Sequence, residues 1–276
     1  MHKSILMTGC STGIGYYAAQ QLRARGYQVI ASCRQLHDVE RLRSEGFLSV
    51  HLDLNDSSSI HSAVQETLTL TGGNLFALFN NGAYGQPGAI EDLSRDSLRR
   101  QFETNVFGWV ELTNLLLPVM LKQGNGRIIQ NSSVLGIAAM PLRGAYNASK
   151  YAIEGITDTL RLELMGSGVH ISLIEPGPIR SQFRHNALKA LNDNINMEQS
   201  RHHQTYQKAI ERLAKQETTT PFTLGPEAVY KRLLHALESP RPQVRYYVTF
   251  PTYLVGFMKR VLPSRWLDRL VKAMGN

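Results

Sequence analysis

Two side chains four residues apart in the sequence could carry proton-transfer chemistry. Tyr146 and Lys150 begin a segment with helical periodicity, so both lie on one face of the predicted helix. An ammonium beside a phenol stabilises the tyrosinate and lowers the phenol pKa from about 10. Such a phenol can give a proton to a developing alkoxide or take one from an alcohol. YxxxK alone is usually a surface pair, so its neighbours decide its meaning.

A pair of serines ends a predicted strand shortly before this helix. Ser133 stands 13 residues before Tyr146, and its strand end belongs to the sheet edge where ligands bind. There its hydroxyl can form a hydrogen bond with a substrate oxygen. Neither a GxSxG elbow nor an Asp/His pair at hydrolase spacing accompanies Ser133, so we do not interpret it as a nucleophile.

A glycine-rich turn follows the first predicted strand and opens the first predicted helix. Glycines there let the backbone turn sharply and approach a pyrophosphate, whose charge is stabilised by the amides of a helix start. The spacing is GxxxGxG, and ordinary strand-to-helix turns also use glycine. The candidate cofactor contacts in this turn are Gly9, Ser11, Thr12, Gly13, Ile14 and Gly15.

The second predicted strand ends at Arg34, and no acid follows until Asp38. A fold that prefers NAD places a carboxylate there for the ribose 2′-hydroxyl, whereas a cation suits the 2′-phosphate of NADP. We therefore predict NADP(H), with a solvated surface arginine as the alternative. Asp53 ends the third strand and could accept a hydrogen bond from the adenine amino group, or it could cap a helix that begins at Asn55.

Apolar, strand-like runs alternate with helix-patterned segments through the first 180 residues. Strands that are apolar on both faces and separated by helices predict an α/β fold, a Rossmann-type doubly wound parallel sheet. The predicted strands are residues 3–8, 28–32, 49–54, 75–80, 126–132 and 170–175, with helical segments such as 16–25 and 97–121.

Beyond Pro178 the pattern changes, and residues 181–222 contain no predicted strand before the sheet resumes near 244–249. An insertion at this point would overhang the carboxyl ends of the strands, where ligands bind. Without a linker to divide it, the chain is predicted to be one domain. Its parts are a cofactor-binding and catalytic core (1–180), a helical substrate lid (181–225) and a basic C-terminal extension of a strand and helices (226–276).

The net charge of +8 lies entirely in the last quarter of the chain. Residues 1–200 hold 17 Lys/Arg and 17 Asp/Glu, whereas residues 201–276 hold 13 and 5. This excess could be a solvated face, a contact with anionic lipid or part of a pocket for an anionic substrate. Nucleic acid is the weakest interpretation, because no helix-turn-helix, RNP or zinc-finger spacing accompanies the charge.

The apolar stretch 246–258 is too short to cross a bilayer, since it has 13 residues without a charge and a spanning helix needs about 20. It predicts a terminal strand followed by a helix packed on the domain. A helix lying on a membrane surface is the alternative, and the flanking cations and Trp266 would support it.

Cysteines and histidines give no sign of a disulfide framework or a metal site. Cys10 and Cys33 are best interpreted as small buried residues in a reducing cytosol, and no secretory segment follows Met1. His202 and His203 have no further ligand at metal-binding spacing, and His185 is 17 residues away. We predict a cytoplasmic protein without a metal, with peripheral membrane contact as the open alternative.

Taken in order, these motifs resemble the short-chain dehydrogenase/reductase family from Ser4 to about Ser181. One departure is visible, because Gly82 and Ala83 reverse the usual Ala-Gly order of a cofactor-lining loop. The matching segments are Thr8 to Gly15, Asp53, Asn80 to Ala83, Asn105, Ser133, Tyr146 with Lys150, and Pro176-Gly177-Pro178-Ile179.

The resemblance implies a role for each matching residue. Tyr146 would be the acid/base, Lys150 would lower its pKa and bind the nicotinamide ribose, Ser133 would steady the carbonyl, and Asn105 would hold a water linking Lys150 to solvent. Nicotinamide would carry the hydride. Further cofactor contacts implied in this way are Leu54, Asn81, Gly82, Pro176, Gly177 and Ile179. Family members are often dimers or tetramers, and the C-terminal extension could block one such interface.

Within the family, TGCSTGIG and residues 174–179 are similar to the retinol and 17β-hydroxysteroid dehydrogenase branch and to bacterial NADP-dependent aldehyde reductases. A mostly apolar pocket favours a lipophilic aldehyde, ketone or alcohol over a sugar, although several of its residues could belong to the core instead. The candidate pocket residues are Tyr84, Leu135, Met140, Leu142 and Phe183.

Three functions are compatible with the sequence. The first is an NADP(H)-dependent carbonyl/alcohol oxidoreductase (EC 1.1.1.-). The second is a cofactor-binding sensor with little catalysis, which is disfavoured because Ser133, Tyr146 and Lys150 are all present. The third is a reductase of lipid-derived carbonyls at a membrane surface, which is compatible with the first.

Overall fold

The computed structural model describes residues 3–214 and 222–275. Their centre is a seven-stranded parallel sheet of order β3-β2-β1-β4-β5-β6-β7, which confirms the doubly wound prediction. The order reverses between β1 and β4, so the ligand crevice of such a sheet lies at their carboxyl ends. The strands are β1 (Ser4–Met7), β2 (Gln28–Cys33), β3 (Leu48–His51), β4 (Ala77–Asn80), β5 (Gly126–Asn131), β6 (Val169–Glu175) and β7 (Arg245–Tyr247).

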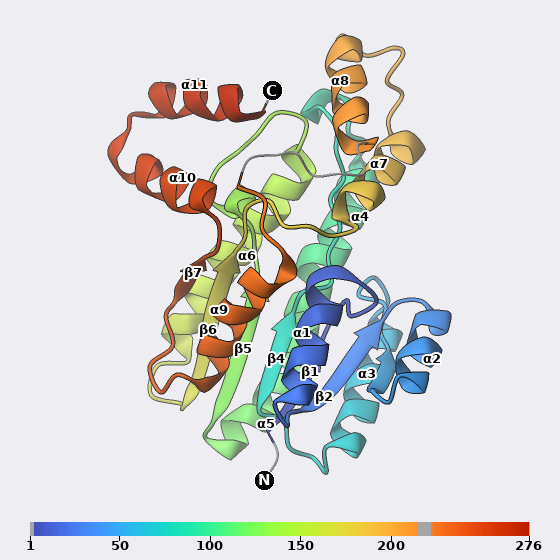
Figure 1. The fold of residues 1–276 in the computed structure, drawn as a ribbon, viewed down its shortest axis with the longest axis vertical. Coiled ribbons are helices and arrows are strands. Elements are labelled where there is room, and N and C mark those ends of the chain that lie inside the picture. The colour runs from blue at the N-terminus through green and yellow to red at the C-terminus, as the bar shows by residue number, and fades with distance from the viewer. Residues whose placement is uncertain (1–2, 215–221, 276) are drawn as a thin grey trace.

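Helices cover both faces of this sheet (Figure 1). One face packs against α1 (Gly13–Ala24), α2 (Leu36–Ser44) and α9 (Pro226–Glu238). The other packs against α3 (Ser57–Leu70), α5 (Gly108–Gln123) and α6 (Gly144–Glu163). The central strands are buried on both sides, and this explains their unbroken apolar runs in the sequence.

The helix predicted over residues 97–121 is not continuous. The structure divides it into α4 (Arg95–Phe102), a π turn (Glu103–Phe107) and α5. At the start of α5 a Cβ on Gly108 would lie 2.2 Å from the carbonyl oxygen of Leu54, so the helix approaches the loop after β3 very closely. Such π turns are common at functional sites, and this one carries Asn105.

Segments flanking the sheet rise beyond its carboxyl ends (Figure 1). On one side are α7 (Phe183–Asn194) and α8 (His203–Ala214), which share an apolar cluster with Ala89, Leu93 and Ala145. The 3₁₀ turn Ile90–Asp92 anchors them, because the Tyr206 hydroxyl donates to Asp92 over 2.7 Å.

On the other side are α10 (Phe250–Val261) and α11 (Ser264–Gly275), which follow the last strand. Val255 of α10 and Leu267 of α11 pack on the 3₁₀ turn Val134–Gly136 at the end of β5. None of the described helices is long and apolar enough to span a membrane.

Candidate active site

The Tyr146 and Lys150 side chains converge at the amino end of α6, beside the end of β5. The Lys150 ammonium is fully buried and donates to the backbone carbonyl of Asn131 over 2.8 Å. It also lies 4.3 Å from the centre of the Trp109 ring and 5.6 Å from that of Tyr146. The helix spacing therefore brings the two side chains together as the sequence predicted.

Burial dominates the ionisation of both groups. It lowers the pKa of Lys150 to about 7, against the opposing charge of Glu154. It raises the pKa of Tyr146 to about 12, while the hydroxyl of Ser133 and the charge of Arg143 act in the opposite direction. The prediction of a lowered Tyr146 pKa is therefore wrong for this geometry, since desolvation of the phenolate outweighs the groups that stabilise it. At neutral pH Tyr146 is a proton donor.

Ser133 is the second residue after β5, and its hydroxyl lies on the same side of the site as Tyr146. The oxygen accepts from the amide of Leu135 over 3.1 Å, and the hydroxyl acts to lower the pKa of the Tyr146 phenol. A carbonyl oxygen that approached both hydroxyls would meet two hydrogen-bond donors at once.

Asn105 lies in the π turn and is completely buried. Its side-chain amide donates to the carbonyl of Tyr84 over 2.9 Å and to the Ser149 hydroxyl over 3.2 Å, and its oxygen accepts from the Tyr84 amide over 3.2 Å. These bonds join the loop after β4 to the residue that precedes Lys150. The side chain thus holds the site together, and its contact with a water stays a prediction.

The glycine-rich turn between β1 and α1 has the conformation that only glycine accepts easily. Gly9 and Gly13 have φ values of +69° and +60°. A Cβ on Gly15 would lie 2.2 Å from the carbonyl oxygen of Gly9. Thr12 precedes the helix without a side-chain cap, so its first amides are open to an anion. This cradle fits the pyrophosphate of a dinucleotide.

A series of hydrogen bonds connects the glycine-rich turn to Lys150. The Thr8 hydroxyl accepts from the amides of Asn81 and Gly82 over 2.8 and 2.7 Å. Asn131 in turn donates to the side-chain oxygen of Asn81 over 2.8 Å, and its own carbonyl receives Lys150. Asn131 was not among the residues predicted for the site, because only the neighbouring position of β4 and β5 reveals it.

The reversed Gly82-Ala83 order fits this loop. A Cβ on Gly82 would lie 3.2 Å from the amide nitrogen of Gly9 and 3.3 Å from the Thr8 hydroxyl, which is closer than a side chain tolerates well. The Gly82 carbonyl accepts from the Trp109 indole over 2.8 Å, and Ala83 packs into the core. Glycine therefore stands where two backbone segments meet.

Arg34 is exposed at the end of β2, and no carboxylate pairs with it in the described part of the chain. The nearby Asp38 and Glu45 bind Arg41 instead, over 3.2 and 2.8 Å. Arg41 also donates to the carbonyl of Ser11 over 2.7 Å. It is thus a second cation at the glycine-rich turn, which no spacing rule had identified.

Asp53 does not cap a helix. Its carboxylate accepts from the amide of Asn55 over 3.0 Å, whereas α3 begins at Ser57 and is capped by Asp56 through the amide of Ser58. The cap alternative is therefore wrong, because the turn delays the helix start by two residues. Adjacent Leu54 is buried beside Gly82.

The segment after β6 lies against two other elements. The Pro176 carbonyl accepts from the amide of Val134 over 2.8 Å, and a Cβ on Gly177 would lie 2.1 Å from the Thr249 hydroxyl. Ile179 pairs with Leu224 in an isolated parallel bridge. These contacts fix the loop beside Ser133.

Three of the five predicted pocket residues surround Tyr146. Phe183 meets its ring edge-on with 5.2 Å between centroids, and Leu135 and Met140 share its apolar cluster. Leu142, with φ +59°, packs instead into the cluster beneath α7 and α8.

Tyr84, the remaining pocket residue, is fixed by hydrogen bonds of its backbone to the Asn105 side chain. Its amide and carbonyl bind Asn105, and burial raises the pKa of its phenol while Arg100 and Arg34 act in the opposite direction.

Both cysteines are free and buried in the core between the sheet and α1, α2 and α9. Burial raises the pKa of both thiols, that of Cys33 to about 12, so neither is a thiolate at neutral pH. Among the described residues no group of three His, Cys, Asp or Glu side chains could hold a metal ion.

Comparison with known proteins places this site in a family. Residues 3–192 match the model described as short chain dehydrogenase. The chain is 44% identical over 272 residues to the uncharacterized oxidoreductase YbbO of Escherichia coli K12, covering 99% of this chain and 95% of that protein. It is 31% identical to the NADPH-dependent 3-dehydrocapnine reductase of Ornithobacterium rhinotracheale, covering 96% and 94%.

Similarity also extends to the predicted branch and to solved structures. Human 17-beta-hydroxysteroid dehydrogenase type 1 is 32% identical, with 89% of this chain and 77% of that protein covered. A short-chain dehydrogenase from Streptomyces avermitilis has the same fold, with a TM-score of 0.79 at 24% identity over 98% of this chain and 96% of that one. The chain is an oxidoreductase that belongs to the short-chain dehydrogenase/reductase family.

Proposed function

We propose that this protein is an NADP(H)-dependent oxidoreductase that interconverts a lipophilic aldehyde or ketone and its alcohol. The observation that carries the proposal is the convergence of Ser133, Tyr146 and Lys150 at the sheet edge that also holds the glycine-rich turn. When bound, the nicotinamide supplies or accepts the hydride.

The protein groups would handle the oxygen and its proton. In the reductive direction Ser133 and Tyr146 bind the carbonyl oxygen, and the neutral phenol gives its proton to the alkoxide as it forms. The Lys150 ammonium, fixed by the Asn131 carbonyl, stabilises the phenolate left behind and orients the nicotinamide ribose. Asn105 braces the same helix from the π turn.

Two observations support NADP(H) over NAD(H). Arg34 stands exposed where the adenosine ribose of a dinucleotide lies in this fold, with no carboxylate to replace it. In addition, one relative that spans nearly the whole chain is named NADPH-dependent. Cellular NADP pools would then favour reduction.

A lipophilic substrate fits the side chains around the phenol. Phe183 meets the Tyr146 ring directly, and Leu135 and Met140 pack in the same cluster. Apolar walls with a few placed polar groups are typical of sites for lipophilic ligands. We infer that α7 and α8 form the lid over this substrate; residues 215–221 of the predicted lid (181–225) lie outside the described residues.

Fluorescence titration with NADPH and NADH, followed by a panel of medium-chain aldehydes, retinal and a keto-steroid, tests the proposal. We expect tighter binding of NADPH and its oxidation by at least one lipophilic carbonyl. Binding without turnover on any carbonyl would favour the sensor alternative, and binding of neither cofactor would reject the proposed function.

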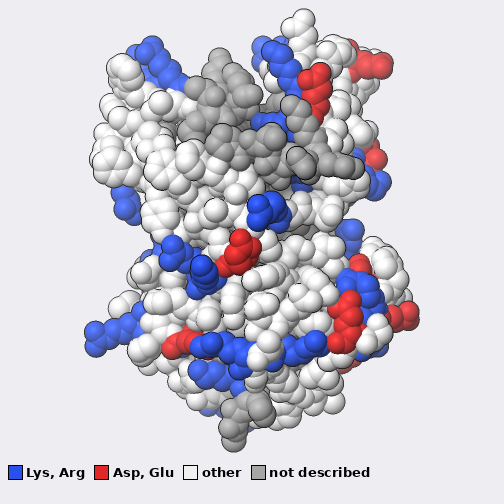
Figure 2. Space-filling model, in the orientation of Figure 1, with Lys and Arg blue, Asp and Glu red and all other residues white. Residues whose placement is uncertain are grey.

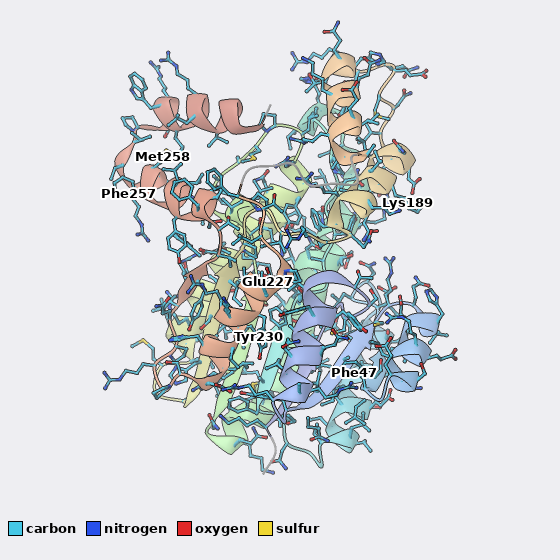
Figure 3. All side chains as sticks on the ribbon, in the orientation of Figure 1. Phe47, Lys189, Glu227, Tyr230, Phe257 and Met258 are labelled. Carbon is cyan, nitrogen blue, oxygen red and sulfur yellow. The ribbon has the colours of Figure 1, made fainter. Side chains whose placement is uncertain are left out.

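A second proposal concerns the C-terminal helices, which we infer to bind an anionic membrane weakly from the cytoplasm. Residues 239–276 contain seven Lys or Arg and one acid, Asp268. In Figure 3 Phe257 projects from α10 away from the body, and its side chain is 63% exposed. The other large apolar side chains exposed here are Phe250, Tyr253, Leu254, Val261, Trp266 and Leu270.

The charge around these helices is mostly positive. On the face drawn in Figure 2, acidic and basic side chains alternate over the lower half, whereas basic ones stand alone at the upper left, where Figure 1 places α11. Apolar side chains flanked by Lys and Arg are typical of helices that lie in a membrane interface.

Vesicle sedimentation should show whether the C-terminal helices bind a membrane or contact only solvent. We expect the full chain to pellet with phosphatidylserine-containing vesicles at low salt, and Phe257→Glu to reduce pelleting severalfold, since the charge opposes insertion. Leu36→Glu on α2 is the matched control, because Leu36 is similarly exposed, at 65%, and lies outside the C-terminal helices. Equal pelleting of both variants, or pelleting unaffected by lipid charge, would reject the membrane contact.

We also propose that the protein is a homo-oligomer, a dimer or tetramer, through the helices on the α5–α6 side. Large apolar side chains are exposed there, including Phe107 just before α5 and Ile156 and Leu162 on α6. Light scattering during size exclusion measures the state directly, and a monomer at micromolar concentration would contradict the proposal.

A further inference from the structure

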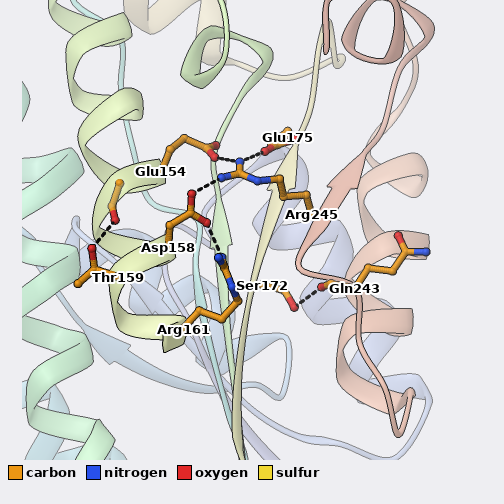
Figure 4. A network of polar contacts seen from close by, with 9 residues as sticks. Glu154, Asp158, Thr159, Arg161, Ser172, Glu175, Gln243 and Arg245 are labelled. Carbon is orange, nitrogen blue, oxygen red and sulfur yellow. Dashed lines mark hydrogen bonds and ion pairs between the residues drawn. The ribbon is translucent and has the colours of Figure 1, made fainter. Parts of the chain in front are cut away.

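A cluster of acidic and basic side chains lies behind the candidate active site, where β6 and β7 meet α6 (Figure 4). One guanidinium nitrogen of Arg245 donates to both Glu154 and Glu175, the latter over 2.6 Å. The other donates to Asp158 over 2.7 Å, and Arg161 also pairs with Asp158. Glu175 is completely buried and Glu154 nearly so, whereas Asp158 is partly exposed.

This cluster touches the active site through the end of β5. The Ser132 hydroxyl donates to the carboxylate of Glu154. Ser132 stands between Asn131, whose carbonyl binds the Lys150 ammonium, and Ser133. Glu154 also follows Lys150 by one turn of α6. Asn131 and Ser132, neighbours at the end of β5, therefore bind Lys150 and Glu154 respectively.

Lys150 has no close counter-ion. It is buried, and no carboxylate lies within ion-pair distance of it in the described structure. A buried charge without a compensating charge is strongly unfavourable. Burial and the charge of Glu154 raise the pKa of Glu175 to about 8, so Glu175 is mostly protonated at neutral pH. This leaves Glu154, one turn after Lys150 on α6, as the buried carboxylate that can offset the ammonium.

We propose that Glu154 is a positioning residue of the oxidoreductase site, whose carboxylate is the counter-charge of the Lys150 ammonium. The inference rests on the proposed function, because it assigns Glu154 a role in keeping Lys150 ready for that reaction. Ser132 and Arg245 hold the carboxylate in place from opposite sides.

The electrostatics agree with this geometry. Glu154 is the charge that opposes the lowering of the Lys150 pKa by burial. Burial, and then the charge of Glu154, raises the pKa of Glu175. A like charge thus acts on the neighbouring acid, and Arg245 is the cation that opposes it.

Other charged groups near Glu154 lie on its outer side. Together with Glu154 and Arg245, the side chains of Tyr151, Lys259 and Arg260 line a cavity of about 470 Å³ between α6, β7 and α10. Lys259 lies against the Tyr151 ring, 4.8 Å from its centre, and no ion pair joins Lys259 or Arg260 to Glu154 in the described structure. On the inner side, Lys150 faces the rings of Tyr146 and Trp109.

Glu154→Gln tests the proposal because it removes the charge and retains hydrogen-bonding capacity. Without the carboxylate, Lys150 should lose its proton at lower pH. Reduction needs the ammonium, so the alkaline limb of the kcat/KM profile should move to lower pH by about one unit, which is about a tenfold loss of activity on that limb. The pH dependence of NADPH affinity should shift in the same direction, because Lys150 binds the ribose.

Two variants separate the charge at Glu154 from general damage. Asp158→Asn removes a carboxylate that binds the same Arg245 and should leave the profile unchanged. Glu154→Asp keeps the charge and should restore most of the wild-type profile. If Glu154→Gln does not fold, as judged by circular dichroism, Ser132→Ala releases the carboxylate from the strand end and should shift the limb in the same direction by less.

The outcomes distinguish the role of Glu154 from the proposed function. Wild-type protein that binds NADPH and reduces a carbonyl, combined with an unshifted Glu154→Gln profile, would overturn the role of Glu154 alone. An equal shift in Asp158→Asn would overturn it too, since the whole cluster would then be responsible. Wild-type protein that neither binds nor turns over would reject the proposed function instead.

Discussion

Replacement of Tyr146 by Phe should lower kcat by at least about 100-fold and leave NADPH affinity nearly unchanged. General acid catalysis contributes roughly 10² to 10⁴ in rate, and the substitution removes only the phenolic oxygen. The ring remains to pack against Phe183 and the Leu135 cluster, so the pocket keeps its shape. The measurement is steady-state reduction of the best carbonyl found, with NADPH binding followed by fluorescence.

Tyr151→Phe is the matched control for this experiment. It makes the same change on the same helix, at a side chain that is 39% exposed and contacts Lys259 instead of the catalytic groups. We expect its kcat to stay within about twofold of wild type, as for most surface substitutions. If Tyr146→Phe also kept its activity within about threefold, Tyr146 would not be the general acid.

The pKa of Tyr146 could not be predicted from the sequence. The spacing of Tyr146 and Lys150 predicted their meeting on one helix face, and the structure brings them together. The spacing carries no information on burial, however, and burial raises the Tyr146 pKa instead of lowering it. Periodicity indicates which side chains are neighbours, whereas desolvation depends on all elements packed around them.

The sheet was predictable because its signal is local. Each strand from β1 to β6 is a short apolar run, and the parallel arrangement follows from the helices between the runs. The break at the π turn was not predictable in this way, since apolar residues continue through it. It depends on contacts with the loop after β4 and with Ser149 on α6.

The ion cluster behind the site has no motif that could have predicted it. Arg245 and Glu154 are 91 residues apart, and each belongs to a segment with the pattern of an ordinary strand or helix. Only the position of β7 beside β6 brings the guanidinium to α6. The contact between Arg245 and Glu154 is therefore encoded by the order of strands, whereas Glu154 itself follows Lys150 by one turn of α6.

Replacement of Arg34 by Asp should weaken NADPH binding by about 100-fold and leave NADH affinity within a few fold. A hydrogen bond to a charged group contributes about 1.5–3 kcal/mol, and the new carboxylate adds repulsion against the 2′-phosphate. The same carboxylate could accept from the 2′-hydroxyl of NADH, which offsets the lost contact. Because Arg34 is exposed and unpaired with any described carboxylate, its replacement should leave the fold intact.

Titration of both cofactors against Arg34→Asp and Arg99→Asp decides where the 2′-phosphate is recognised. Arg99 is also exposed but pairs with Asp96 on α4, so its reversal should affect neither cofactor. Equal weakening of NADPH and NADH by Arg34→Asp would show that the phosphate is bound elsewhere. Arg41 would then be the residue to replace, because its guanidinium already reaches the Ser11 carbonyl in the glycine-rich turn. Loss restricted to NADPH would make one exposed arginine at the end of β2 the determinant of cofactor choice.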